Sequence, residues 1–72
     1  MTTFRIYTAP NTNASAIGER LASATQSAWR NAVDNCDNTG EGRVFLDCDD
    51  NLAEIAMTEL ENDASVTAYD VL

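Results

Sequence analysis

Three short stretches of the chain alternate apolar and polar residues, and this period of two predicts β-strands. The first stretch spans residues 3–8, the second residues 43–48 and the third residues 65–72. The second joins Val, Phe and Leu in succession, and the third is rich in Val, Thr and Tyr, which are residue types that favour strands. The pattern therefore predicts three strands.

Side chains alternate across a strand, so each predicted strand has two faces. One set of faces, expected under the helices, carries Phe4, Ile6, Val44, Leu46, Cys48, Val66 and Ala68. The other set, expected to form an open face, carries Arg5, Tyr7, Phe45, Asp47, Thr67, Tyr69 and Val71. Aromatic residues on all three strands make an apolar patch there, and such patches often mark an interface. Two explanations stay open, namely contact with a partner or second copy, and burial within the chain.

Two longer stretches have the 3.6-residue period of amphipathic helices. The first, residues 14–35, has an apolar stripe of Ile17, Leu21, Ala24, Ala28 and Ala32, flanked by Trp29, Val33 and Cys36. The second begins near residue 52 and has a stripe of Leu52, Ile55, Ala56 and Leu60. Asn51 followed by Glu54 resembles a capping box, which favours a helix start at this point.

The predicted order is strand, helix, strand, helix, strand. Each helix joins two strands, so parallel pairing is the expected arrangement. The sequence thus predicts an α/β fold, a two-layer βαβαβ unit with a three-stranded sheet and two helices packed mainly on one face. Residues 1–72 form a single domain at this length.

The charge balance narrows the range of functions. The chain has 12 acidic residues and four basic ones, all arginine, which gives a net charge of −8. Aromatic residues on an open sheet are also found in RNA-recognition modules, but this charge has the wrong sign for autonomous binding to phosphates. An acidic surface suits attraction to a basic protein groove instead. We therefore expect no direct binding of nucleic acid.

One segment, residues 44–50 with the sequence VFLDCDD, resembles the nucleophile strand of haloacid dehalogenase-type phosphatases. That resemblance implies Asp47 as nucleophile and Asp49 as acid/base, with magnesium between them. The chain departs from the family pattern, because Asn51 replaces its Thr or Val and no Lys is present. A solvated strand end and helix cap is the simpler interpretation. We expect no enzyme activity, no metal and no cofactor.

The two cysteines and the hydropathy of the chain indicate the compartment. Cys36 and Cys48 lack zinc-site spacing, and no His is present. They are expected at opposite ends of the second strand, too far apart for a bridge, so two free thiols are predicted. No segment is long or apolar enough to span a membrane, and the N-terminal residues lack the pattern of a signal peptide, so none is expected. A cytoplasmic protein without membrane contact is the expectation.

The small size, acidic charge and lack of catalytic motifs resemble those of small phage-encoded anti-defence proteins, above all anti-CRISPR proteins. The resemblance implies an inhibitor that blocks a basic, nucleic-acid-handling effector complex in the host cytoplasm. The acidic residues expected to contact that partner are Glu41, Asp47, Asp49, Asp50, Glu54, Glu59, Glu61 and Asp63. The aromatic residues expected to contribute are Tyr7, Phe45 and Tyr69. The alternative is a structural or regulatory α/β module that forms a homodimer through its sheet.

Overall fold

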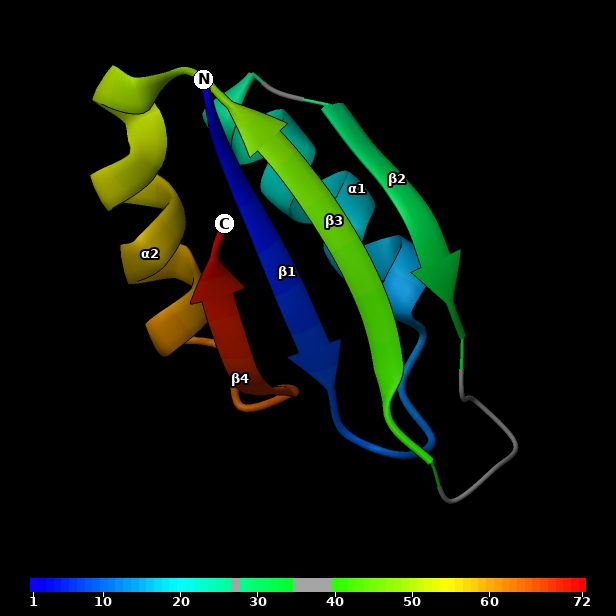
Figure 1. The fold of residues 1–72 in the computed structure, drawn as a ribbon. Coiled ribbons are helices and arrows are strands. Elements are labelled where there is room, and N and C mark those ends of the chain that lie inside the picture. Colours follow the sequence, from blue (N-terminus) through cyan, green and yellow to red (C-terminus); the bar gives the residue numbers. More distant parts are fainter. Residues whose placement is uncertain (27, 35–39) are drawn as a thin grey trace.

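The computed structural model describes residues 1–26, 28–34 and 40–72 and has six main elements and one short 3-10 turn (Figure 1). The strands are β1 (Thr2–Thr8), β2 (Ala28–Val33), β3 (Gly42–Cys48) and β4 (Val66–Val71). The helices are α1 (Ala14–Thr25), the 3-10 turn η1 (Asp50–Leu52) and α2 (Ala53–Glu61).

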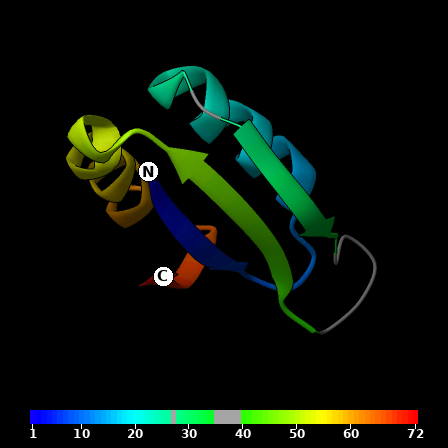
Figure 2. The same cartoon turned by 45° about the horizontal axis from the view of Figure 1, so that its top comes forward.

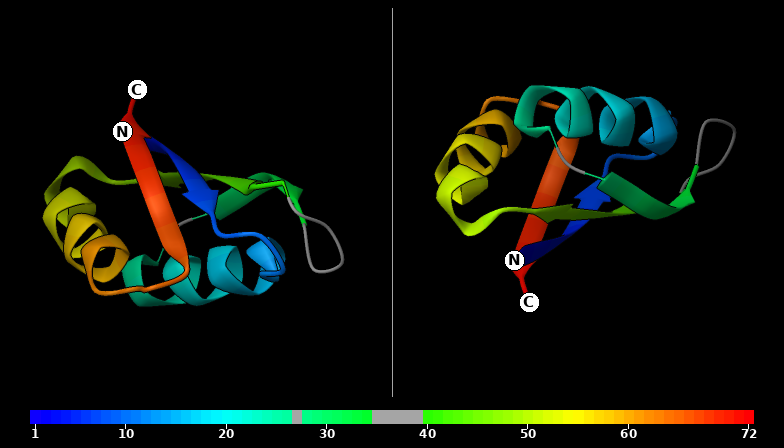
Figure 3. Two further views of the ribbon diagram at one scale, coloured as in Figure 1. Left: turned by 90° about the horizontal axis from the view of Figure 1, so that it is seen from below. Right: turned by 90° about the horizontal axis from the view of Figure 1, so that it is seen from above.

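The four strands form one antiparallel sheet in the order β2-β3-β1-β4. Both helices lie on the same side of this twisted sheet, and its other side is left open (Figures 2 and 3). The order βαββαβ is that of the split βαβ, or ferredoxin-like, arrangement. The predicted α/β class and the placement of two helices on one face are confirmed. The prediction of three strands, a βαβαβ order and parallel pairing is wrong.

The error arises in the stretch expected to be one long helix. α1 ends at Thr25, and Gln26 follows in the left-handed region with φ of 51°, which turns the chain back into β2. The predicted stripe continues past the true end of the helix because Ala28 and Ala32 keep the 3.6-residue spacing, although both lie in β2. Trp29 instead pairs with Leu46 of β3 and packs on Gly18, where an added Cβ would lie 3.0 Å from its ring. The Trp29 ring can therefore pack against α1 while its backbone belongs to β2.

A β-bulge reverses the two faces of β4 relative to the prediction. Tyr7 pairs with Ala68 and Thr8 with Val66, so Thr67 is the additional residue between these pairs. An additional residue inverts the alternation beyond it. Tyr69 therefore faces the helices, with its ring 6.0 Å from that of Phe4 in an edge-on contact.

Ala68 and Asp70 consequently occupy the open side of β4, opposite Tyr7 and Arg5. The placements of Ala68 under the helices and of Tyr69 and Val71 on the open face are both corrected.

The core lies between the sheet and the two helices. Its buried residues are Phe4, Ile6, Ala14, Ile17, Leu21, Val44, Leu46, Cys48, Ala56 and Leu60. The alternation predicted for β1 and β3 is thereby confirmed. In α2 the predicted stripe is wrong at Ile55, which is 48% exposed, and Met57 packs against the core instead. Asn51 lies within η1, and α2 begins after Leu52 without a side-chain cap, so the predicted capping box does not form.

Cys48 is buried at the end of β3. Cys36 lies outside the described residues, so the prediction of two free thiols stays untested. Within the described ranges, neither helix has the length and apolar character needed to cross a membrane.

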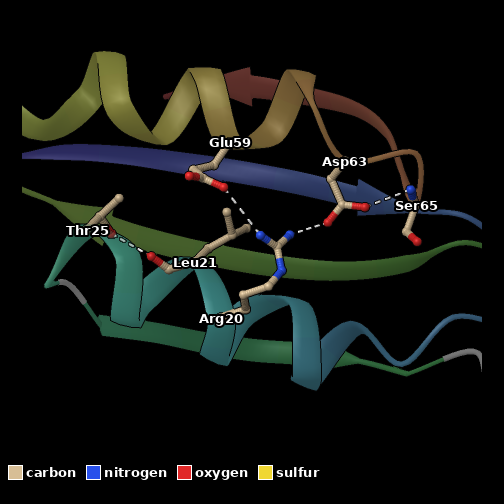
Figure 4. Close-up of polar contacts among 6 residues, drawn as sticks. All are labelled: Arg20, Leu21, Thr25, Glu59, Asp63 and Ser65. Atoms are coloured by element: carbon tan, nitrogen blue, oxygen red, sulfur yellow. Dashed lines mark hydrogen bonds and ion pairs between the residues drawn. The ribbon is translucent and has the colours of Figure 1, made fainter.

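Two threonines are buried in the fold, and their hydroxyl groups differ in environment. The Thr25 hydroxyl donates a hydrogen bond of 2.8 Å to the carbonyl oxygen of Leu21 (Figure 4). The Thr8 side chain is 0% exposed, and no hydrogen-bond partner for its Oγ1 lies among the described residues. A buried hydroxyl without a partner destabilises the folded state.

We predict that Thr8→Val raises the free energy of unfolding by about 1 kcal/mol, because it removes the unpaired hydroxyl and places a strong strand former in β1. The matched change Thr25→Val should lower it by about 1 kcal/mol, because it removes a formed hydrogen bond. Urea unfolding followed by the fluorescence of Trp29 measures both. Equal losses of stability in the two variants would show that the Thr8 hydroxyl is hydrogen-bonded in solution.

Candidate functional site

The side of the sheet away from the helices, called the open face below, is one of two candidate surfaces. The antiparallel register, with a shift in β2 between Arg30 and Val33, assigns to it Thr3, Arg5, Tyr7, Ala28, Arg30, Val33, Arg43, Phe45, Asp47, Ala68 and Asp70, and Leu72 follows beside Thr3. Three of the four arginines of the chain thus share this face with two carboxylates. The open face has one positive charge in excess, although the whole chain is strongly acidic.

Two ion pairs connect neighbouring strands on the open face. Arg30 Nε lies 2.8 Å from Asp47 Oδ2, and Arg5 Nη2 lies 2.8 Å from Asp70 Oδ2. The Arg30 guanidinium also lies 5.3 Å from the centre of the Phe45 ring, within the range of cation–π attraction. These contacts join β2 to β3 and β1 to β4.

Tyr7, on the central strand β1, lies between the guanidinium groups of Arg5 and Arg43. The Arg5 and Arg43 guanidinium carbons lie 5.8 Å and 5.9 Å from the centre of its ring. Arg43 makes no ion pair with a carboxylate in residues 1–26, 28–34 and 40–72. It is therefore the arginine of this face with a charge left for an external partner.

Asp47 is the most constrained carboxylate of the open face. Its side chain is 17% exposed and accepts hydrogen bonds from Arg30 and from the Thr3 hydroxyl at 2.7 Å. The Arg30 hydrogen bond, aided by that of Thr3, holds the pKa of Asp47 below its ordinary value of 3.8. Asp47 therefore links β3 to its two neighbouring strands, and it is less available for binding a partner protein than an unpaired carboxylate would be.

The second candidate surface is an acidic band along the β3–α2 connection and α2 (Figure 1). Its members are Asp49, Asp50, Glu54, Glu59, Glu61 and Asp63. Asp49 and Glu54 are exposed and make no side-chain hydrogen bond or ion pair in the part of the chain that the structure describes. Asp50 Oδ1 lies 3.0 Å from the N-terminal ammonium group and accepts the Thr2 hydroxyl, and these contacts lower its pKa.

The C-terminal half of the acidic band, Glu59 to Asp63, contacts α1 through ion pairs. Arg20 of α1 reaches between Glu59, at 3.4 Å, and Asp63, which it contacts closely (Figure 4). Asp63 also accepts the amide of Ser65 at 2.8 Å, which caps the turn into β4.

Glu61, in the same half of the band, is bound to the sheet. It accepts the Tyr69 hydroxyl at 2.7 Å, and this hydrogen bond raises the pKa of Tyr69. Glu59, Glu61 and Asp63 therefore have structural partners, whereas Asp49 and Glu54 have none among the described residues.

The predicted contact residues thus fall into four places. The acidic band contains six of the eight predicted carboxylates. Asp47 lies on the open face with Tyr7 and Phe45, and Glu41 lies at the opposite end of β3, where it accepts the Thr67 hydroxyl at 2.5 Å. Tyr69 belongs to the helix side.

The sequence interpretation placed Arg5 on the aromatic surface but missed Arg30 and Arg43 there. The signal was present for Arg43, which shares the period of two with Phe45. Arg30 was hidden because its segment was assigned to a helix. In the described ranges no three Cys, Asp or Glu side chains converge in a way that could hold a metal ion.

We predict that Asp47→Asn lowers the free energy of unfolding by about 0.5–1 kcal/mol at pH 7, because it removes the partly exposed ion pair with Arg30. A lowered folded-state pKa stabilises the fold above the unfolded pKa, and this contribution disappears as pH falls through the folded value. The difference between the variant and the parent should therefore shrink between about pH 5 and pH 2. Thermal unfolding across this range measures it.

The matched control is Asp49→Asn, two residues along the chain at an exposed carboxylate with no partner among the described residues. It should change stability little at any pH. A pH-independent loss in Asp47→Asn would assign the effect to packing rather than to the ionised carboxylate.

Comparison of the chain with protein-family models, with curated proteins and with solved structures found no match. The split βαβ arrangement hosts many unrelated functions, so topology by itself assigns none. We therefore infer function from the charges and contacts of the two surfaces.

Proposed function

We propose that this protein is an acidic protein-binding inhibitor of the anti-CRISPR-like kind, which acts in the cytoplasm and blocks a nucleic-acid-binding effector complex by occupying its basic groove. The observation that carries the proposal is the set of unpaired, exposed carboxylates at the start of the acidic band. Asp49 and Glu54 are both exposed and have no internal partner in the described chain. Unpaired charges of one sign at one edge are available to a partner of opposite sign.

The uneven distribution of charge supports this proposal. Away from the open face, the described chain has nine carboxylates and a single arginine, Arg20. Asp37 lies outside the described residues. The described residues away from the open face therefore carry a charge of −8, whereas the open face carries +1. A surface of this sign repels phosphates and attracts arginine- and lysine-lined grooves, and it accelerates association with them.

The geometry of α2 favours an elongated basic partner surface. Glu54 and Glu61 are seven residues apart, so they lie on one face of the helix and about 10 Å apart along its axis. Asp49 and Asp50 precede this helix and extend the line of carboxylates beyond its first turn. A line of negative charges along an edge matches a groove that holds a phosphate backbone.

The contacts within the acidic band support a choice among its members. Arg20 occupies Glu59 and Asp63, and Tyr69 occupies Glu61. We therefore assign the binding contribution mainly to Asp49 and Glu54, which are unpaired in the described chain, together with Asp50, whose side chain stays 75% exposed although it pairs with the N-terminus. Tyr7 and Phe45, also expected in the contact, lie on the open face and not on this band. The proposal therefore assigns them no role in binding the effector.

The test is the triple variant Asp49→Lys, Asp50→Lys and Glu54→Lys, assayed for inhibition of DNA or RNA binding by purified CRISPR effector complexes. We expect affinity for the inhibited complex to fall about ten- to hundredfold, because three screened pairs become repulsive. Affinity of the parent protein should also fall as salt rises, since exposed charges are screened.

A matched pair of single variants separates local from global charge effects. Glu54→Lys and Glu19→Lys change the net charge equally, and both replace exposed helical glutamates without a partner in the described chain. Only Glu54→Lys should weaken inhibition. Thermal unfolding checks the fold, because Lys in the first turn of a helix is slightly destabilising. The proposal is wrong if no effector complex is bound, or if binding ignores both salt and the triple reversal.

A further inference from the structure

We propose that the open face binds the open face of a second copy of this chain, with a two-fold axis that runs parallel to β1 and β3 and passes between them. This inference concerns the surface opposite the helices and does not depend on the proposed inhibition. The strand register makes the open face complementary to itself about this axis, and not about the two-fold axis perpendicular to the strands.

The register arranges the open face in three rows across the strand order β2-β3-β1-β4. The first row is Ala28, Asp47, Thr3 and Leu72, whose amide donates to the Thr3 carbonyl at 2.8 Å and continues the ladder. The second row is Arg30, Phe45, Arg5 and Asp70. The third row is Val33, Arg43, Tyr7 and Ala68.

The proposed axis lays β2 over β4 of the second copy and β3 over its β1, row on row. Aligned sheets pack at about 30°, so the central strands stay superposed. The facing pairs are then Arg30 with Asp70, Phe45 with Arg5, Arg43 with Tyr7, Val33 with Ala68, Leu72 with Ala28 and Asp47 with Thr3. Each pair matches a cation with a carboxylate or ring, a large apolar side chain with a small one, or a carboxylate with a hydroxyl.

The alternative two-fold axis, perpendicular to the strands, is unfavourable. It would place Arg5, Arg30 and Asp70 each against its own copy in the partner, and like charges facing one another across an interface oppose association. The charge pattern of the second row therefore selects the axis parallel to the strands.

Exposed apolar side chains also favour a covered open face. Val33 is 50% exposed and Leu72 is 61% exposed, at opposite corners of the face. The two aromatic rings between them are half-buried. In the proposed dimer each corner side chain meets an alanine, which leaves room for it. A face of four strands is about 19 Å wide and about 24 Å long, so the contact is small and a micromolar dimer is expected.

The dependence on salt concentration distinguishes this dimer contact from the binding of a partner through the acidic band. Each copy has a charge of −8, while the open face itself is nearly neutral. Repulsion between whole molecules therefore opposes dimerisation, and salt screens it. We expect the dimer to tighten between 50 and 500 mM NaCl, roughly across the range where the Debye length shortens to a few ångströms. Binding to a basic partner changes in the opposite direction, so the two proposals can fail separately.

The first experiment is sedimentation equilibrium over micromolar to millimolar protein, at low and high salt, with a matched pair of variants. Val33→Asp places a charge against Ala68 of the second copy and should weaken the dimer about tenfold or more. Ile55→Asp makes the same change of charge at a residue that is 48% exposed on α2, and it should leave the dimer unchanged. Circular dichroism verifies that both variants fold.

The second experiment tests the orientation by compensation. Ala68→Val should weaken the dimer because two large side chains then meet, and Val33→Ala in the same chain should restore it. Val33 and Ala68 lie on the two edge strands, about 14 Å apart across the sheet, so they do not touch within one copy. Recovery in the double variant can arise only across the interface.

A monomer at all concentrations in high salt overturns the proposal, as does a dimer that responds equally to Val33→Asp and Ile55→Asp. Failure of the double variant to recover overturns the orientation. Binding of labelled single-stranded DNA to the protein tests the alternative that the open face binds nucleic acid. Binding of this DNA that is lost in Phe45→Ala would assign the open face to nucleic acid instead of a second copy.

Discussion

The antiparallel pairing of β1 with β3 is the interaction on which the rest of the structure depends. These two central strands bury Phe4, Ile6, Val44 and Leu46 completely on one side. Both helices pack on that apolar surface, since it is the largest continuous one that the strands offer. The alternation of side chains then forces the intervening residues of β1 and β3 to the opposite side, where no helix covers them.

That constraint divides the surface of the molecule into two regions of different character. The open face combines arginines, aromatic rings and two carboxylates and is locally close to neutral. The helix side and the β3–α2 connection carry most of the negative charge. Arg20 is the one arginine on that side, and its contacts with Glu59 and Asp63 join the two helices. The carboxylates left without partners lie at the start of α2, so this end is the part best suited to a basic partner.

The small size of the chain makes contacts with other molecules energetically useful. A domain of 72 residues buries only about 60% of the surface that its unfolded chain exposes. A partner that covers the open face would remove Val33 and Leu72 from water. Desolvating Arg5, Asp70, Arg30 and Asp47 would cost less than desolvating unpaired charges, since each already has a partner within its own sheet. A dimer formed in this way would present two acidic bands, and two-site binding raises the apparent affinity for a partner with repeated basic sites.

The sequence by itself determined the elements in which local pattern and tertiary environment agree. β1 and β3 have a strict period of two, and their buried and exposed residues lie as the period predicts. The concentration of carboxylates between Asp49 and Asp63 is likewise a property of sequence, since neighbours on a connection and a short helix stay close in space. The acidic band and the positions of Tyr7 and Phe45 on the open face could therefore be predicted from the sequence alone.

Only the tertiary structure decided β2 and the faces of β4. Residues 28–33 continue the spacing of a helical stripe, but they form a strand in the structure. The edge of β3 supplies their hydrogen-bond partners, and Gly18 of α1 leaves room for the Trp29 ring. That choice brought Arg30 to Asp47 and Phe45. In β4, the bulge at Thr67 is a property of its pairing with β1, which no local period reveals. One additional residue moved Tyr69 to the core and Asp70 to Arg5, because side chains beyond a bulge change sides.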